Sequence, residues 1–179
     1  MRFTHISRCW CLMILALILA GCAGYKAGNI SSADLNGVKT IYVPVVKNET
    51  YEPSIQVMFT NALIRSLEND GTFHTTRLAK ADASLEVTIT SFDRNPMLYS
   101  RDNTIVPLEF RGTMIAKITL INNLTGKTVY KDYGISAYTD YFTLQNSQQR
   151  DAVEAERQAL PIAAQKLADK ITARISEGW

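Results

Sequence analysis

Residues 108–121 read Leu-Glu-Phe-Arg-Gly-Thr-Met-Ile-Ala-Lys-Ile-Thr-Leu-Ile, and this stretch decides the fold. A period of two predicts a strand with one buried face. Phe110, Met114, Ala116, Ile118 and Leu120 fall on that face, and Arg111, Thr113, Lys117 and Thr119 on the other. Residues 122–127, Asn-Asn-Leu-Thr-Gly-Lys, predict a hairpin turn in which Gly126 adopts a positive φ. We expect residues 128–141 to return as an antiparallel neighbour, with these residues on one face: Val129, Tyr133, Ile135, Ala137 and Tyr141.

The chain before this hairpin predicts short strands around one helix. Residues 38–46 favour a strand that lies at a sheet edge or breaks near Pro44, because proline cannot donate to a ladder. Residues 54–70 predict an amphipathic helix, which begins after Pro53 and stops at Gly71. Its apolar face contains Ile55, Phe59, Ala62, Leu63 and Leu67. Two further strands are expected, at residues 73–77 and around Leu85, Val87 and Ile89.

Two more segments complete the expected architecture. Residues 93–96, Asp-Arg-Asn-Pro, break the alternation, so residues 97–103 are expected to form a turn or hairpin tip. Residues 148–176 carry apolar residues every three or four positions and predict a helix that Pro161 kinks or divides. The fold class is therefore α+β: a mainly antiparallel four-stranded sheet with two helices packed on one face.

The N-terminus has the pattern of a lipoprotein signal. Arg2 and Arg8 precede an apolar run over residues 9–20, and Gly21 and Cys22 follow it. This run is shorter than the roughly 20 residues that span a bilayer. We expect residues 1–21 to be a signal peptide cleaved between Gly21 and Cys22, with acylated Cys22 anchoring the chain to a membrane. Residues 22–37 would form a flexible tether, and residues 38–179 a single domain.

Cleavage would change both the charge and the cysteine content. The full chain has 19 Lys and Arg against 17 Asp and Glu, and the signal removes two arginines, so the mature chain is formally neutral. No overall positive field draws it to nucleic acid. Cys9 and Cys11 leave with the signal, so Cys22 would be the last of the 3 cysteines and the domain would contain no disulfide.

The mature chain has few residues suited to catalysis. His74 is its one histidine, and no serine lies in a Gly-x-Ser-x-Gly turn. With a single histidine and one acylated cysteine, no metal-ligand spacing exists, and no glycine-rich phosphate loop is present. We interpret His74 as a surface or half-buried strand residue. The sequence favours a binding or structural role with no catalytic residues, no metal and no cofactor.

One stretch combines cations with apolar residues. Arg94, Arg101 and Arg111 lie among Met97, Leu98, Tyr99, Ile105 and Phe110. Guanidinium groups suit bidentate contacts with phosphate, and the apolar neighbours suit acyl chains or a partner's wall. The alternative is an ordinary hairpin in which the arginines pair with Asp93, Asp102 and Glu109. A second cluster, interpreted as half-buried sheet residues that could also suit an interface, consists of Tyr130, Tyr133, Tyr138, Tyr141 and Phe142.

Several motifs together resemble one family, the lipopolysaccharide-assembly lipoproteins of the LptE type. The most specific part is residues 39–53, Lys-Thr-Ile-Tyr-Val-Pro-Val-Val-Lys-Asn-Glu-Thr-Tyr-Glu-Pro. Supporting parts are residues 19–25, Leu-Ala-Gly-Cys-Ala-Gly-Tyr, residues 61–65, Asn-Ala-Leu-Ile-Arg, residues 81–87, Ala-Asp-Ala-Ser-Leu-Glu-Val, and the Thr-Gly-Lys turn at 125–127. The resemblance covers nearly the whole mature chain.

The resemblance implies an outer-membrane lipoprotein that faces the periplasm. Such proteins plug a large LptD-type β-barrel translocon, support its assembly and bind lipopolysaccharide during export. A basic residue in the middle hairpin loop is linked to that binding, and Arg101 best matches its place, with Arg94 and Arg111 nearby. Two alternatives are a lipid-anchored structural subunit of another envelope machine (a pilus, secretin or peptidoglycan-associated assembly) and a lipid-anchored hydrolase, which the missing nucleophile disfavours.

Overall fold

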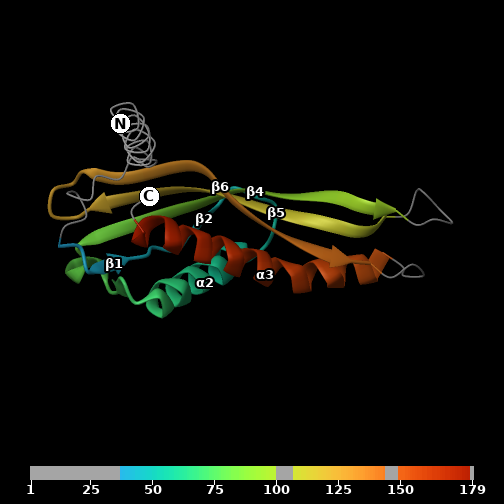
Figure 1. Cartoon of the computed structure of the whole chain (residues 1–179), viewed down its shortest axis with the longest axis horizontal. Coiled ribbons are helices and arrows are strands. Elements are labelled where there is room, and N and C mark those ends of the chain that lie inside the picture. Colours follow the sequence, from blue (N-terminus) through green and yellow to red (C-terminus); the bar gives the residue numbers. More distant parts are fainter. Residues whose placement is uncertain (1–36, 100–106, 144–148, 178–179) are drawn as a thin grey trace, which may run out of the picture. The chain divides into compact units, whose positions relative to one another are not determined.

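The computed structural model describes residues 37–99, 107–143 and 149–177 (Figure 1). Cys22, Gly21 and Arg101 lie outside these residues. The elements, in chain order, are β1 (Thr40–Tyr42), β2 (Lys47–Asn48), α2 (Ile55–Asp70), β3 (His74–Thr75), a short 3-10 turn (Leu78–Lys80), β4 (Ala83–Tyr99), β5 (Pro107–Asn122), β6 (Thr128–Phe142) and α3 (Gln149–Ser176). The class is α+β, as expected.

The sheet is mixed and has six strands, so the expectation of four mainly antiparallel strands is wrong in that detail. Its order is β3-β1-β4-β5-β6, and β2 also pairs with β4. β4, β5 and β6 are antiparallel, whereas β1, β2 and β3 all make parallel pairs. The parallel pairing of β1 with β3 follows from the connection between them, because α2 crosses over and returns the chain in the same direction.

The first predicted strand is broken near Pro44, which is one of the two outcomes expected from the sequence. β1 ends at Tyr42 and β2 begins at Lys47, and each contacts a different part of β4. The core residue Ile41 is fully buried at the first of these contacts. Two short parallel strands therefore line β4 where the sequence predicted one longer strand.

β4 passes through residues 93–96, so the predicted break there is wrong. Arg94 lies opposite Gly112, and Pro96 lies opposite Phe110. Beyond Ile89 the short strands no longer pair with β4, and its second side is an edge of the sheet. Proline is tolerated at such an edge because its missing N–H would point away from the ladder.

β6 contains a bulge that corrects one predicted face. Ala116 pairs with Ile135 while Ile118 pairs with Asp132, so one extra residue is accommodated on β6. The bulge reverses the alternation, and Tyr133 is exposed although the sequence placed it with Ile135. In β5 the predicted face is confirmed, because Met114, Ala116, Ile118 and Leu120 are buried; Gly126 has φ 68° in the turn that follows.

The two helices lie on one face of the sheet (Figure 1). α2 matches its prediction, and Gly71 ends it with φ 77° and an N–H bond to the Leu67 carbonyl. α3 is one helix with Pro161 inside it, so proline does not divide it. The core between helices and sheet includes Phe59, Leu63, Leu67, Leu85, Ile118, Leu167 and Ile171. Among the described residues, no helix is both long and apolar enough to cross a membrane.

Candidate functional site at the hairpin end

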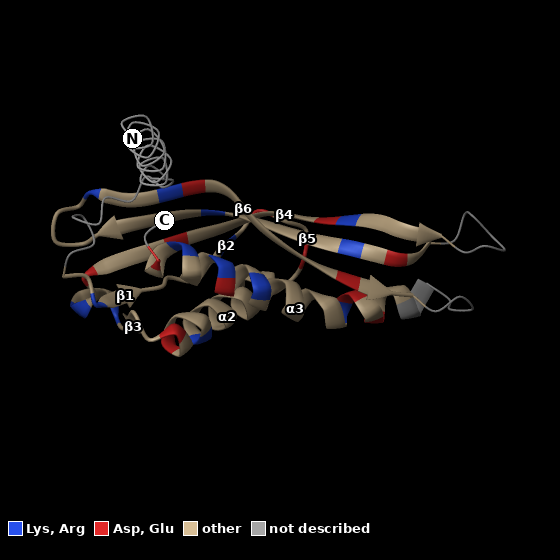
Figure 2. Cartoon of the chain, viewed as in Figure 1, with Lys and Arg blue, Asp and Glu red and all other residues tan. Residues whose placement is uncertain are grey.

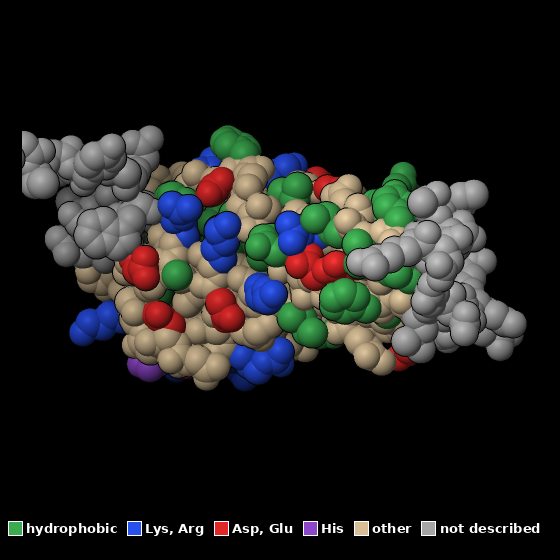
Figure 3. All heavy atoms as spheres, turned by 45° about the vertical axis from the view of Figure 1, so that its right-hand side comes forward, with side chains coloured by type: hydrophobic (Ala, Val, Ile, Leu, Met, Phe, Trp, Pro, Cys, Tyr) green, Lys and Arg blue, Asp and Glu red, His purple; other side chains and the backbone are tan. Residues whose placement is uncertain are grey.

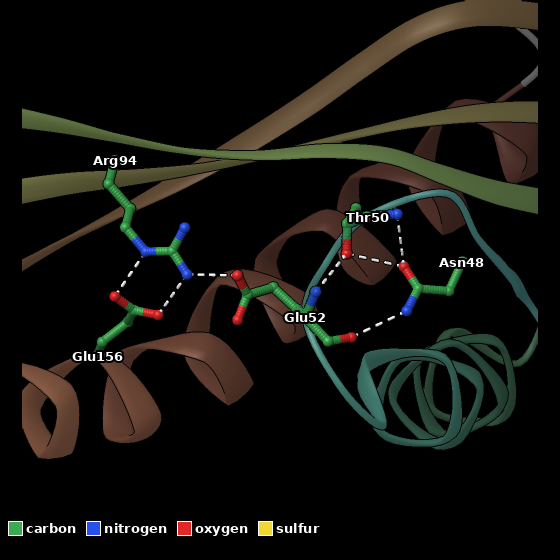
Figure 4. Close-up of polar contacts among 5 residues, drawn as sticks. All are labelled: Asn48, Thr50, Glu52, Arg94 and Glu156. Atoms are coloured by element: carbon green, nitrogen blue, oxygen red, sulfur yellow. Dashed lines mark hydrogen bonds and ion pairs between the residues drawn. The ribbon is translucent and has the colours of Figure 1, made fainter.

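Arg94 joins three separate parts of the fold. It extends from β4 over the ring of Phe92, with its Cζ atom 5.1 Å from the ring centroid. Its Nε and one terminal nitrogen each donate to a carboxylate oxygen of Glu156 on α3, at 2.6 Å. The same terminal nitrogen donates to Glu52, just before α2 (Figure 4). One cation therefore ties β4 to α3 and to the segment that leads into α2.

The segment 47–53 is folded by Asn48 so that Glu52 reaches Arg94. The Asn48 side-chain oxygen accepts from the N–H and hydroxyl of Thr50, at 2.8 and 2.7 Å. Its amide donates to the Glu52 carbonyl at 2.9 Å, and the Thr50 hydroxyl accepts from the Glu52 N–H (Figure 4). These contacts give a structural role to the most specific motif in the sequence.

Contacts within this cluster shift the pKa values of Arg94 and Tyr141. Hydrogen bonds, first to Glu156 and then to Glu52, raise the pKa of Arg94 above its usual value. Burial raises the pKa of Tyr141, and the charge of Glu156 adds to this effect. The side chains of Arg94, Glu52 and Glu156 are 37%, 16% and 21% exposed, so water reaches Arg94 more easily than its partners.

Gly112 provides the space beneath this cluster. A Cβ atom built there would lie 2.8 Å from Phe92 Cζ, and Tyr141 is also within contact distance. Glycine thus lets the Phe92 ring lie close to β5, and this ring supports Arg94. Phe110 stacks on Tyr141 nearby, with ring centroids 5.6 Å apart.

Arg111 makes its own pair on the other face of the sheet. Its Nε and a terminal nitrogen donate to the two oxygens of Asp140, at 2.7 and 2.9 Å, and its Cζ lies 4.2 Å from the centroid of Tyr138. The Asp140 contact raises the pKa of Arg111 and lowers that of Asp140. Because Arg111 neighbours Gly112, which lies opposite Arg94, the two arginines face opposite sides of the sheet.

The structure thus brings Arg94 and Arg111 to the same end of the sheet but not to one pocket. Their carboxylate partners are Glu52, Glu156 and Asp140, and the sequence reasoning predicted none of these pairings. Asp140 lies directly opposite Arg111 in the β5–β6 register, so correct strand alignment could have found it. Glu156 is 62 positions from Arg94, and no local signal connects the two.

Apolar side chains are exposed around the same end. Figure 3 shows hydrophobic side chains interspersed with charged ones, more densely toward the hairpin end. In the strands there, the exposed apolar residues are Met97, Leu98, Tyr99, Tyr138 and Phe142. Of the tyrosine cluster, Tyr141 is buried and Tyr130 half-buried as interpreted, but Tyr133, Tyr138 and Phe142 are exposed. Both signs of charge occur across the strands and helices (Figure 2).

His74 lies far from this cluster in the fold, on β3, with a 71% exposed side chain. Its Nδ1 is 3.5 Å from Glu68 Oε2. Glu68 accepts from both the N–H and the hydroxyl of Thr75, which lowers its pKa. These contacts connect α2 to β3. Among residues 37–99, 107–143 and 149–177, no three potential ligands gather to hold a metal ion.

The sequence pattern of the LptE family, described as lipopolysaccharide-assembly, matches residues 38–175. This chain belongs to the LptE family. The family consists of envelope-associated, non-catalytic lipoproteins, and at that level this chain is a lipopolysaccharide-assembly lipoprotein. In a sequence comparison, no curated protein matches this chain.

Solved structures share the LptE-family fold of this chain. A hypothetical protein from Chlamydia trachomatis has a TM-score of 0.55 at 11% identity, over 78% of this chain and 96% of that chain. A minor lipoprotein from Acinetobacter baumannii has a TM-score of 0.50 at 14% identity, over 78% and 94%. A candidate lipoprotein from Caulobacter crescentus has a TM-score of 0.50 at 18% identity, over 74% and 88%. These likenesses concern the fold alone.

Proposed function

We propose that this chain is an outer-membrane lipoprotein on the periplasmic face that plugs an LptD-type β-barrel and supports its assembly. The observation that carries the proposal is the family match over residues 38–175. The protein would act without catalysis, cofactor or metal, by binding the barrel and the lipopolysaccharide that passes through it. The formal charge balance of the mature chain supports a partner other than nucleic acid.

The anchor is part of this proposal. Residues 1–21 would be removed, and Cys22 would carry the acyl groups that hold the protein to the outer-membrane lipid. Residues 22–37 would connect the lipid to the domain at 38–179. A flexible tether of that length has a root-mean-square span of about 20 Å, which lets the domain enter a partner while the lipid stays in the membrane. Changing Cys22 to serine should leave an uncleaved, unacylated precursor; normal acylation would contradict the anchor.

Lipopolysaccharide would bind at the end of the β4–β5 hairpin. It carries phosphates beside acyl chains, and this end has Arg101 following the exposed apolar residues Met97, Leu98 and Tyr99. Arg101 is the proposed phosphate ligand. Arg94 and Arg111 already hold carboxylates, so a phosphate would have to exchange for Glu156 or Asp140 to reach them. The exchange at Arg111 is the more accessible of the two, because the Arg111–Asp140 pair lies on the sheet face without helices.

Co-purification tests the partner. The tagged full chain is isolated from membranes in mild detergent, and the proteins that accompany it are identified and quantified by mass spectrometry. A large outer-membrane β-barrel in near-equal amount is the expected result. A pilus, secretin or peptidoglycan-associated complex, with no such barrel, would replace this proposal with that of a structural subunit of another envelope machine.

Charge reversal tests the lipid site. Arg101→Asp should weaken binding of purified lipopolysaccharide by about tenfold or more, because the variant loses a hydrogen bond to a charged group. Co-sedimentation measures the change. Arg65→Asp, on exposed α2 surface, makes the same charge change and is the matched control. Equal losses in the two variants would mean that only total charge matters, and Arg101 would not be a specific ligand.

A further inference from the structure

The strands at the two ends of the sheet order differ greatly in length, and β4 beyond Ile89 adds a further open edge. One end strand is β3, with 2 residues, and the other is β6, with 15. An edge strand presents backbone N–H and C=O groups to which a further strand can bond. A two-residue edge offers little to pair with, but β6 is long enough to accept another strand along the side of the domain.

Side chains occupy backbone groups along the β6 edge. Lys170 Nζ donates to the Ser136 carbonyl at 2.9 Å, and Lys166 Nζ donates to the Tyr138 carbonyl at 3.3 Å. Within the bulge, two positions before Ser136, the Gly134 N–H donates to the Asp132 carboxylate at 3.0 Å. One backbone group of each of three alternate residues, Gly134, Ser136 and Tyr138, is therefore already bonded to a side chain.

The spacing of the two lysines matches the strand that they cover. Four residues of helix rise about 6 Å, and two residues of strand about 6.8 Å. Lysines one turn apart on α3 therefore reach alternate carbonyls of β6, which lies alongside (Figure 1). An added strand would have to displace both ammonium groups before it could bond to these carbonyls.

We propose that Lys166 and Lys170 close the β6 edge to strand addition by a second copy of this chain. Two β6 strands could pair antiparallel about a twofold axis, because each strand offers the same backbone pattern to the other. Such pairing would also bring together the two lysines of each copy, four like charges at one junction, which opposes association. The lysines thereby keep β6 unpaired and the domain single.

The full chain in mild detergent provides the test, by sedimentation velocity over a wide range of concentration. The double variant Lys166→Ala, Lys170→Ala should double the protein mass relative to wild type at high concentration. The control, Lys117→Ala with Lys131→Ala, removes the same charge from strands β5 and β6 without touching the edge carbonyls, and should keep the wild-type mass. The conservative pair Lys166→Arg, Lys170→Arg should also keep it.

A third change separates edge pairing from other association. Ser136→Pro removes an N–H on the open side of β6, so adding it to the double alanine variant should restore the wild-type mass. Far-ultraviolet circular dichroism confirms that each variant is folded. The proposal is overturned if the double alanine variant keeps the wild-type mass, if the control associates equally, or if Ser136→Pro does not reverse the association.

Discussion

The two halves of the three long strands are held in different ways. The core half, residues 83–89, 114–122 and 128–135, packs on helices through fully buried side chains such as Leu85, Ile118 and Leu120. The hairpin half, residues 91–99, 107–113 and 137–142, is held by two arginine–carboxylate pairs and stacked rings. Apolar burial gives the core half its stability, whereas the hairpin half keeps several apolar side chains exposed.

This difference indicates which half of the strands tolerates the loss of a contact. A buried leucine contacts many neighbours, and its loss leaves a cavity that the surroundings fill only in part. A partly exposed ion pair contributes less, because water screens it and already solvates its members. The hairpin half can therefore exchange contacts on binding at modest cost, while the core half keeps the sheet and helices together.

The largest effect is expected from a cavity in the core half. Leu85→Ala should lower the free energy of unfolding by about 3 kcal/mol, since this side chain is fully buried. Denaturant titration followed by circular dichroism measures the change. Ile162→Ala, at a half-exposed site on α3, is the control and should change stability by less than about 0.5 kcal/mol. Equal losses would erase the contrast between buried and exposed packing.

Removal of Arg94 should have a smaller effect on stability. Arg94→Ala leaves Glu52 and Glu156 close together without their cation, and we expect a loss of about 1–2 kcal/mol. Arg94→Lys keeps the charge but not the paired contact with Glu156, and should recover part of the loss. The same titration, with Arg65→Ala as control, measures both. A loss as large as that of Leu85→Ala would show that the hairpin half depends on this pair as much as the core half depends on burial.

Gly112 offers a test of the packing beneath Arg94. Gly112→Ala puts a methyl group 2.8 Å from Phe92 Cζ and should cost about 1 kcal/mol. Gly134→Ala is the matched control, because nothing lies within 4 Å of its added Cβ. Phe92→Leu in the Gly112→Ala background should relieve the crowding, so the two losses should be non-additive. Strict additivity in thermal melts would refute this contact.

Acid should give the smallest effect, at Asp82, the residue just before the core half begins. Asp82 accepts from the N–H groups of Lys39 and Thr40 and from the Thr40 hydroxyl, and these bonds lower its pKa. A lowered folded-state pKa adds stability above the unfolded value and loses it as pH falls through the folded value. Asp82→Asn should therefore flatten the decline in melting temperature below about pH 4. An unchanged decline would mean that other carboxylates govern acid unfolding.

Local pattern was enough for the elements whose neighbours are close in sequence. The helix at Ile55–Asp70 and the buried face of β5 follow from periodicity, and the turn follows from Gly126. The sheet's parallel strands depend on α2 as a crossover, which no single segment reveals. The course of β4 through Pro96 depends on where the neighbouring strands end. The exposure of Tyr133 depends on a bulge that forms only when β5 and β6 pair.

The candidate site was predicted only in part, for a related reason. Its arginines are visible in the sequence, but Glu52 and Glu156 come from segments far from Arg94 along the chain. The segment 39–53 signalled the family, and the structure adds that Asn48 shapes part of it so that Glu52 meets Arg94. Which face each arginine occupies depends on strand register, which composition and spacing do not specify.

Hydrogen exchange with and without purified lipopolysaccharide tests the central claim most directly, that the hairpin half is the binding end of this lipoprotein. The full chain in mild detergent is labelled with deuterium, and its peptides are analysed by mass spectrometry. The account predicts slower exchange in peptides covering 91–99, 107–113 and 137–142, with no change in 83–89 and 114–122. Protection confined to the core half, or absent from the hairpin half, would contradict it.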